Sequence, residues 1–287
     1  MFSIIVPTFN NIEYLKLCLN SLKRNSNFNH EIIIHINEGN DGTLDYAKNC
    51  NLKFSYSKIN TGVCVAFNEG VKLATKKYIV LAHDDMYFCP NWDNVFISEL
   101  KKIPTDNDFF LSGTMVQPFE SYINLDCGKN INDFDEKKLL EELPKIKFND
   151  FQGTHWQPSL IPIRTWNKVG GFSEEFTPGL GSDPDFNMKL WNSGVRLFKG
   201  LGNSRVYHFS SLSLRKKAWN NGAKTFLLKW GISIKFFKKY YLRSDQNFEG
   251  VLSEPKKNIN FYLELFFCKI KYFYYLITTF AKYKKID

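Results

Sequence analysis

Residues 3–10 read SIIVPTFN, a short apolar run that contains a proline and leads into polar residues. A short run rich in β-branched residues and ended by proline is typical of a buried strand. Three further apolar runs follow at 31–36, 52–58 and 78–82. Because helical patterns lie between them, we predict βαβ units and an α/β fold, with a mostly parallel or mixed sheet flanked by helices.

The remaining segments are consistent with this fold class. Helical spacing of apolar residues predicts helices at 12–25, 43–50, 63–74, 163–169 and 183–193. A fifth strand is predicted at 108–116, whereas the polar segment 129–150 is expected at the surface. Ligands of such sheets bind beyond the carboxyl ends of the strands, so we look for chemistry in the segments that follow each strand.

Composition divides the chain into two unequal regions. The 287 residues are 44% hydrophobic and 23% charged, which excludes an intrinsically disordered protein. Residues 216–287 hold 15 of the 38 lysines and arginines, 5 of the 29 acidic residues and 18 of the 47 aromatic residues. We therefore predict a nearly neutral domain over 1–215 and a basic, aromatic, helical C-terminal region over 216–287, with the boundary near Ser211–Arg215.

Three features concern the cellular setting. No stretch reaches the roughly 20 consecutive apolar residues that cross a bilayer. The first residues lack the basic segment and cleavage site of a secretion signal. The six cysteines are scattered without a C-x-x-C pair, which argues against a structural zinc site and against a disulfide framework. We expect a cytoplasmic protein with reduced thiols.

Two acidic clusters stand where a predicted strand or helix meets a loop. Residues 83–85 (HDD) follow the strand at 78–82. Carboxylates there suit a divalent cation that bridges to phosphate, although aspartates are equally common in turns. Residues 181–185 (GSDPD) begin a helix, where Ser and Asp are ordinary N-terminal caps and a carboxylate base is the alternative.

Two further signals are weak when taken alone. Residues 60–70 (NTGVCVAFNEG) place Gly62 before a helix whose N-terminus suits a phosphate, but they match neither a P-loop nor G-x-G-x-x-G. His208 ends another apolar stretch, and a single histidine in that position is more often structural than a ligand.

In this order and combination the segments resemble the family 2 nucleotide-sugar glycosyltransferases, which have the GT-A fold, over roughly residues 1–211. The matching segments are 5–10 (IVPTFN), 37–43 (NEGNDGT), 60–70, 83–92 (HDDMYFCPNW), 169–174 (VGGFSE), 182–185 (SDPD) and 206–208 (VYH). The resemblance implies an inverting enzyme that uses Mn²⁺ or Mg²⁺ to move a sugar from a nucleoside-diphosphate sugar to a hydroxyl of a glycan or lipid-linked glycan. Cell-surface polysaccharide synthesis is the setting it implies.

The resemblance also implies a role for each matching residue. Asp183 is the expected catalytic base, and Asp85, His208 and His83 are expected at the metal ion. Contacts to the donor are expected from Pro7, Thr8, Asn10, Asn37, Glu38, Asn60, Gly62, Asn68 and Asp84. For the acceptor we expect segments 113–127 and 153–157, with His155, Trp156 and Asp185. Trp156 is suited to stack on a sugar ring.

Three positions depart from the family pattern. His83 stands where the first acid of Asp-x-Asp is usual, so the metal site is expected to depend on Asp85 and His208. Ser182 replaces a glutamate and leaves Asp183 as the matching base. Asn37 replaces an aspartate that the family often places near uracil, which leaves the base of the donor open.

The C-terminal region carries its own pattern. Apolar residues recur at helical spacing at Ile259, Tyr262, Leu263, Phe266, Ile270, Phe273, Ile277 and Phe280. Lys257, Glu264 and Lys271 lie on the other side. Two interpretations have equal weight: a helix packed on the catalytic domain or on another subunit of a homo-oligomer, and a helix within 256–285 that lies peripherally on the inner face of an anionic plasma membrane.

Other functions explain less of the sequence. A nucleotide-dependent dehydrogenase needs a glycine-rich turn after the first strand, where this chain has PTFN at 7–10. A nucleic-acid-binding module would account for the basic tail but not for the acidic motifs, so we expect no nucleic-acid partner. A non-catalytic relative that binds nucleotide sugars stays open because His83 and Ser182 depart from the pattern.

Overall fold

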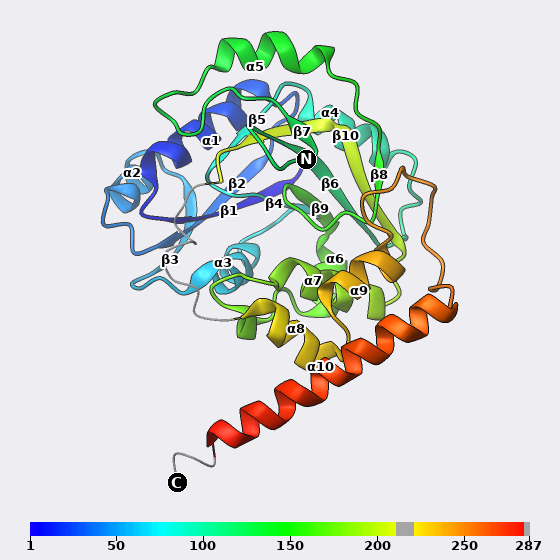
Figure 1. The fold of residues 1–287 in the computed structure, drawn as a ribbon. Helices are drawn as coiled ribbons and strands as arrows, with labels where there is room; N and C mark the ends of the chain where they lie inside the picture. The colour runs from blue at the N-terminus through cyan, green and yellow to red at the C-terminus, as the bar shows by residue number, and fades with distance from the viewer. Residues whose placement is uncertain (211–220, 284–287) are drawn as a thin grey trace.

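A mixed β-sheet forms the centre of the molecule (Figure 1). The computed structural model describes residues 1–210 and 221–283. The strands run in the order β3-β2-β1-β4-β9-β6-β10-β5, with β7 beside β6 and β8 beside β10. They are β1 (Ser3–Phe9), β2 (Glu31–Asn37), β3 (Lys53–Ser57), β4 (Tyr78–Leu81), β5 (Met86–Phe88), β6 (Phe109–Gln117), β7 (Ile123–Asn124), β8 (Phe151–Gln152), β9 (Ser159–Pro162) and β10 (Leu197–His208).

The first four strands are parallel to one another, whereas β9 runs antiparallel between β4 and β6. Alternate residues of β1 face opposite sides of the sheet, and both sides are buried. Ile4 and Val6 pack with Leu15 and Phe96 on one face, while Ile5 packs on the other face. This two-sided burial is the reason that the strand reads as a continuous apolar run.

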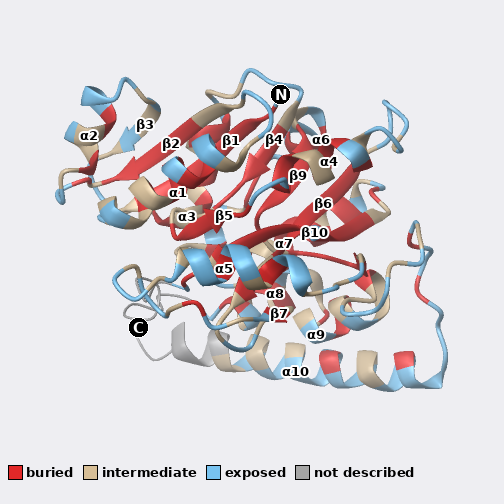
Figure 2. Ribbon diagram, turned by 90° about the horizontal axis from the view of Figure 1, so that it is seen from above, coloured by how far each residue is buried: buried red, intermediate tan, exposed pale blue. Residues whose placement is uncertain are grey.

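Helices cover both faces of the sheet (Figure 1). They are α1 (Ile12–Asn25), α2 (Thr43–Asn49), α3 (Gly62–Val71), α4 (Trp92–Leu100), α5 (Glu136–Glu142), α6 (Ile163–Val169), α7 (Ser182–Asn192), α8 (Gly222–Trp230), α9 (Ile234–Phe236) and α10 (Ile259–Tyr283). A π-helical turn at Phe237–Leu242 continues α9. The core between the sheet and helices α3, α6 and α7 extends outward to α8 and α9, and the sheet itself is buried between the helical layers (Figure 2).

The α/β fold predicted from the sequence is confirmed, and each predicted strand and helix of the first 100 residues is present. The sequence did not indicate β5, β9 or the length of β10. The strand β9 has only four residues, which include a serine and a proline, so no apolar run marks it. The segment 129–150 contains α5, and the predicted boundary near Ser211–Arg215 lies outside the described residues.

The C-terminal region is tied to the domain by a strap at 243–252. Gln152 N donates to Gln246 O at 2.8 Å, and Phe248 N donates to Asp150 O at 3.0 Å. Asn247 forms a β-bridge with Phe151. The strap therefore adds backbone hydrogen bonds to the domain, and the C-terminal region contributes to its surface.

Helix α10 packs on this layer through a different face from the one that its sequence indicates. Phe261 and Cys268 are buried against α8 and α9, and Leu265, Tyr272 and Tyr275 are partly buried beside them. The predicted apolar stripe, described from Ile259 to Ile277, is exposed; Phe280 lies beyond the described side chains. Packing of this stripe on the catalytic domain is therefore contradicted. Within 1–210 and 221–283, no helix is both long and apolar enough to span a bilayer.

Candidate active site

The loops that follow β1, β2, β3 and β4 meet at one edge of the sheet and enclose a pocket of about 100 Å³. Their convergence follows from the parallel arrangement, which brings the carboxyl ends of neighbouring strands together. The predicted donor residues that line the pocket are Pro7, Thr8, Asn37, Asn60, Gly62 and Asp84, with His83 beside them. We call this pocket the donor-side pocket.

Hydrogen bonds between loops hold this pocket in shape. Asn37 Oδ1 accepts from both the backbone N and the hydroxyl of Thr61, each at 2.9 Å. Gly62 has a φ of +79°, and an added Cβ there would lie 2.7 Å from the side chain of Thr177. A larger residue at Gly62 is therefore strained in its backbone and obstructed, so glycine allows Thr177 and Pro178 to pack closely against the start of α3.

Three other predicted donor residues lie outside the lining. Asn10 and Glu38 hydrogen-bond to each other at 3.1 Å at the rim, and Glu38 also accepts from the backbone of Asn60 at 3.3 Å. Asn68 lies within α3, and its side chain points away from the pocket toward Phe172. It donates to Phe172 O at 3.0 Å and accepts from Phe172 N at 2.9 Å. Asn10 and Glu38 brace the pocket, whereas Asn68 joins two segments of the fold.

Asp84 and Asp85, the acidic pair after β4, lie in two different environments. Asp84 lines the donor-side pocket, where burial and the neighbouring charge of Asp85 raise its pKa to about 7. Asp85 is buried and its Oδ1 lies 3.2 Å from His208 Nε2. The pairing of β10 with β5 aligns His208 with Met86, which places the histidine beside Asp85 although the two are far apart in sequence.

The His208–Asp85 pair is the best candidate for binding a metal. Burial opposes protonation of His208, but the Asp85 carboxylate outweighs it and raises the pKa of the imidazole. Gln117 Nε2 lies 2.8 Å from His208 Nδ1 and orients the ring. Within the described ranges no group of three or more His, Cys, Asp and Glu side chains is arranged for a metal ion. These residues therefore fit a divalent cation only where a substrate completes its coordination.

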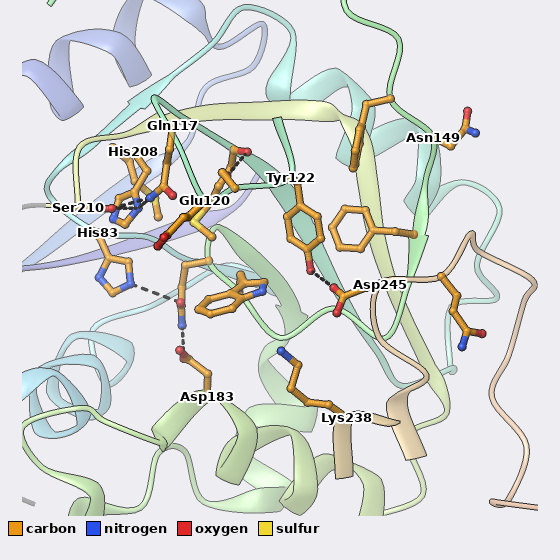
Figure 3. A pocket seen from close by; sticks show the side chains of 18 of the residues that line it. His83, Gln117, Glu120, Tyr122, Asn149, Asp183, His208, Ser210, Lys238 and Asp245 are labelled. Carbon is orange, nitrogen blue, oxygen red and sulfur yellow. Dashed lines mark hydrogen bonds between the residues drawn. The ribbon is translucent and has the colours of Figure 1, made fainter. Parts of the chain in front are cut away.

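A much larger cavity of about 990 Å³ adjoins this pair (Figure 3). His83 and His208 line one end of it, and Trp156, Tyr122 and Lys238 line the other. Its remaining lining residues come from β5, β6, the β6–β7 loop, the segment 147–151, Gln157, Asp183, Ser210 and the strap. We call it the acceptor-side cavity. Segments 113–127 and 153–157, predicted for acceptor contacts, both contribute to its wall.

Asp183 lies in the acceptor-side cavity, close to the donor-side pocket. Gln157 Nε2 donates to Asp183 Oδ1 at 2.7 Å, and Gln157 Oε1 lies 3.3 Å from His83 Nε2 (Figure 3). His83 borders both the donor-side pocket and the acceptor-side cavity, so Gln157 connects the two. Burial raises the pKa of Asp183 to about 6, while the hydrogen bond from Gln157 partly opposes that shift.

Two predicted acceptor residues lie outside the cavity wall. His155 is buried, and the centre of its ring lies 4.4 Å from that of Trp156, with the two rings tilted by 37°. Burial and nearby Lys238 lower the pKa of His155 to about 3. Asp185 is fully buried, and its Oδ1 accepts from Trp230 Nε1 at 2.8 Å and pairs with Lys229 at 2.9 Å. His155 supports Trp156 from behind, and Asp185 joins α7 to α8, so neither faces the acceptor-side cavity.

Several lining residues were not singled out by the sequence. Gln157 lies in a predicted acceptor segment, but nothing in the local pattern indicates that it joins His83 to Asp183. Lys238 and Asp245 come from the C-terminal region; Lys238 Nζ lies 5.7 Å from the centre of the Trp156 ring, and Asp245 accepts from Tyr122 at 3.1 Å. No local motif could reveal these contacts because they depend on how the strap crosses the domain.

Comparison with known proteins finds a similar family and several similar relatives. Residues 3–121 match the family model described as "Glycosyl transferase family 2". Over these residues, which make up less than half of the chain, the protein is similar to this family. The hyaluronan synthase of Pasteurella multocida is 27% identical over 224 residues, which cover 75% of this chain and 21% of the synthase. A Rickettsia prowazekii protein named as an uncharacterized glycosyltransferase is 30% identical over 177 residues, which cover 61% of this chain and 54% of the relative.

Solved structures agree on the fold. The structure of Staphylococcus aureus TarS 1–349 superposes with a TM-score of 0.54 at 18% identity, over 72% of this chain and 60% of the TarS chain. A second TarS structure, in complex with UDP-GlcNAc, gives a TM-score of 0.53. At this identity the similarity shows the GT-A-like fold alone. The chain spans about a fifth of the length of the Pasteurella hyaluronan and chondroitin synthases.

Proposed function

We propose that this protein is a family 2 glycosyltransferase, which moves a sugar from a nucleoside-diphosphate sugar to a hydroxyl of a glycan or lipid-linked glycan. The observation that carries the proposal is the position of the Asp183 carboxylate. It is held by Gln157 between a donor-side pocket and an acceptor-side cavity that share His83. A base at that junction lies beside both reactants of a transfer reaction.

Asp183 acts as the general base in this proposal. A pKa of about 6 leaves the carboxylate mostly ionised at neutral pH, yet more basic than an ordinary aspartate. It takes the proton from the acceptor hydroxyl as that oxygen attacks the anomeric carbon. The bond between the anomeric carbon and the diphosphate oxygen breaks in the same step, and the nucleoside diphosphate leaves with its electron pair. A single displacement of this kind inverts the anomeric centre.

The leaving diphosphate carries negative charge that the site must neutralise. In the donor-side pocket, the backbone at the start of α3 faces the position available to the donor. Asp85 and His208 are the residues that would hold Mn²⁺ or Mg²⁺, and such a cation supplies charge neutralisation for the leaving group. Neutral His208 is the form that binds a metal, so protonation of this pair would compete with binding of the cation.

The acceptor-side cavity supports an extended, ring-containing acceptor. Its volume of about 990 Å³ exceeds that of a single sugar, and Trp156 and Tyr122 offer aromatic surfaces for sugar rings. Relatives named as hyaluronan and chondroitin synthases support an acceptor in polysaccharide synthesis. By analogy with the family, we place the reaction on the cytosolic side of the membrane.

A thermal-shift panel tests the donor class. The protein is melted with UDP, GDP, dTDP and, as the control nucleotide, NAD, each with and without Mn²⁺. A ligand at about 100 times its dissociation constant stabilises a fold by about 2.7 kcal/mol, an easily measured shift. We expect stabilisation by one nucleoside diphosphate only when the metal is present. UDP is tested first because TarS has been solved with UDP-GlcNAc. No response to any diphosphate would contradict the proposal.

A second candidate is a non-catalytic protein that binds nucleotide sugars. It is favoured by His83 and Ser182, which stand where the family has acids. Both candidates predict the thermal shift, so turnover separates them. Release of the nucleoside diphosphate from its sugar, measured with a mixture of glycan acceptors, supports the transferase. Binding of the donor sugar without release under any acceptor condition supports the second candidate.

A further inference from the structure

Helix α10 carries a continuous apolar surface that faces away from the rest of the described protein. Its nine large apolar side chains, each at least 50% exposed, are Ile259, Tyr262, Leu263, Phe266, Phe267, Ile270, Phe273, Tyr274 and Ile277. They recur three or four positions apart, so they form one stripe along the helix, which we call the outer face. From Ile259 to Ile277 it extends roughly 27 Å at 1.5 Å per residue.

The outer face and the packed face lie on opposite sides of α10. The packed face, centred on Phe261 and Cys268, has the same helical spacing. Phe261 lies 4.9 Å from the Phe236 ring, and Ser233 N donates to Cys268 Sγ at 3.4 Å. Because these contacts attach α10 to the domain along its length, the outer face is presented as a fixed ridge at the edge of the molecule (Figure 2).

Charge along α10 is distributed in a pattern that suits an anionic surface. Ile270 lies at the middle of the outer face, and its neighbours Lys269 and Lys271 project about 100° to either side of it. Both lysines are exposed. Glu264, the one acidic residue in Ile259–Tyr283, is turned inward, where it pairs with Lys239 and accepts from Tyr240 Oη at 3.0 Å. The outer face is thus apolar with a lysine at each flank.

We propose that the outer face of α10 docks the protein on the surface of a lipid bilayer that contains anionic lipids. The apolar side chains enter the boundary between headgroups and acyl chains, and Lys269 and Lys271 contact the lipid phosphates. The aromatic residues among them, such as Tyr262, Phe266 and Phe273, suit that boundary.

A second copy of the chain fits this surface less well. Two outer faces placed together would bring the flanking lysines of both copies to one interface, with no acidic side chain on the described outer face to pair with them. An anionic bilayer supplies the missing charge. The proposal does not depend on the transferase activity, because docking uses neither the donor-side pocket nor the acceptor-side cavity.

Vesicle co-sedimentation of the full chain tests docking. The vesicles are pure phosphatidylcholine, or phosphatidylcholine with 30% phosphatidylglycerol, each at low and high salt. We expect binding to the phosphatidylglycerol vesicles that weakens at high salt, and much weaker binding to phosphatidylcholine. The double variant F266Q/F273Q should lower the partition coefficient on phosphatidylglycerol vesicles at least tenfold.

Matched variants separate docking from general effects. K269Q/K271Q should reduce binding to phosphatidylglycerol vesicles by about tenfold or more, with little change on phosphatidylcholine. K48Q/K101Q removes two exposed lysines of the domain, and V251Q removes an apolar side chain that is 69% exposed outside α10. Both controls should change binding less than twofold. Circular dichroism melting confirms that each variant is folded.

Three results would overturn the proposal. The first is no sedimentation with either kind of vesicle. The second is sedimentation that F266Q/F273Q does not weaken. The third is a dimer, seen by light scattering without lipid, that F266Q/F273Q abolishes while vesicles are not bound. This outcome would assign the outer face to a second copy.

If the double variant does not fold, F273W replaces it. Its fluorescence should be quenched by brominated phosphatidylglycerol beyond the quenching of the wild type, and unchanged quenching would overturn the proposal as well.

Discussion

The donor-side pocket and the acceptor-side cavity are built in different ways. The pocket is enclosed mainly by short loops after β1, β2, β3 and β4, whose parallel pairing brings their ends together. The cavity takes its wall from the β6–β7 loop, the segments 147–151 and 156–157, the π-helical turn and the strap. Secondary structure positions the first, while packing between distant segments positions the second. Asp183 and Gln157 line the cavity close to His83, the residue that borders both regions.

The largest effect is expected from Asp183→Asn. Loss of a general base lowers turnover by roughly 10²–10⁴-fold. Donor binding, measured by thermal shift, should persist because Asp183 borders the acceptor-side cavity and not the donor-side pocket. Asp45→Asn, on the exposed face of α2, is the control and should leave turnover unchanged. Full turnover in Asp183→Asn would show that Asp183 is not the general base and that the two regions do not meet at this residue.

Asp85→Ala tests whether Asp85 and His208 bind the metal ion. Removal of one of the two protein ligands should weaken metal-dependent nucleotide binding by roughly 10–100-fold. The measurement is a Mn²⁺ titration of the melting temperature at a fixed nucleotide concentration, with Asp45→Ala as the matched control. An unaltered response to Mn²⁺ would show that the pair of Asp85 and His208 does not hold the cation.

Asp183 should also make activity and stability depend on pH in opposite directions. Turnover should fall as the pH decreases through about 6, since only the carboxylate accepts a proton. Its folded pKa is raised above 3.8, so the buried charge costs stability above pH 6, and this cost disappears as the pH falls through 6 toward 4.

Asp183→Asn should therefore stabilise the protein at pH 8 by about 3 kcal/mol and have little effect at pH 4. Urea unfolding at both pH values is the measurement. Equal effects at the two pH values would mean that Asp183 is not held at a raised pKa.

The smallest effect is expected on the acceptor side alone. Trp156→Ala should raise the KM for the acceptor about fivefold, because one aromatic contact of roughly 1 kcal/mol is lost, and should leave donor binding unchanged. Phe119→Ala is the matched control, since Phe119 is 57% exposed and does not line the cavity. A change in donor affinity with Trp156→Ala would break the distinction between the two regions.

Most of the donor-side pocket could be predicted from the sequence, because its residues follow strands that local patterns reveal. The run at 78–82 and the acids at 83–85 place Asp84 and Asp85 at a strand end without any knowledge of the tertiary structure. Asn68 shows the limit of this reasoning: it belongs to the same segment as Gly62, but the turn of the helix directs it to Phe172 instead of the pocket.

The acceptor-side cavity could be predicted only in part. Trp156 and the segment around Tyr122 were expected to contribute, but Asp185 was expected there and is instead buried against Trp230. An acid near the start of α7 can face either the cavity or α8, and no local pattern decides which. Lys238 enters the cavity because the C-terminal region folds back onto the domain.

The sequence by itself determined the α/β class, the strand-end positions of the candidate chemical groups and the helical character of α10, since these depend on local apolar periodicity. Only the tertiary structure decided which residues meet across the site and which apolar face of α10 is packed. Both faces of that helix have helical spacing, and the buried one is selected by its fit against Phe236 and Ser233. Periodicity shows that a surface is apolar, whereas shape complementarity with the rest of the chain determines whether it is covered.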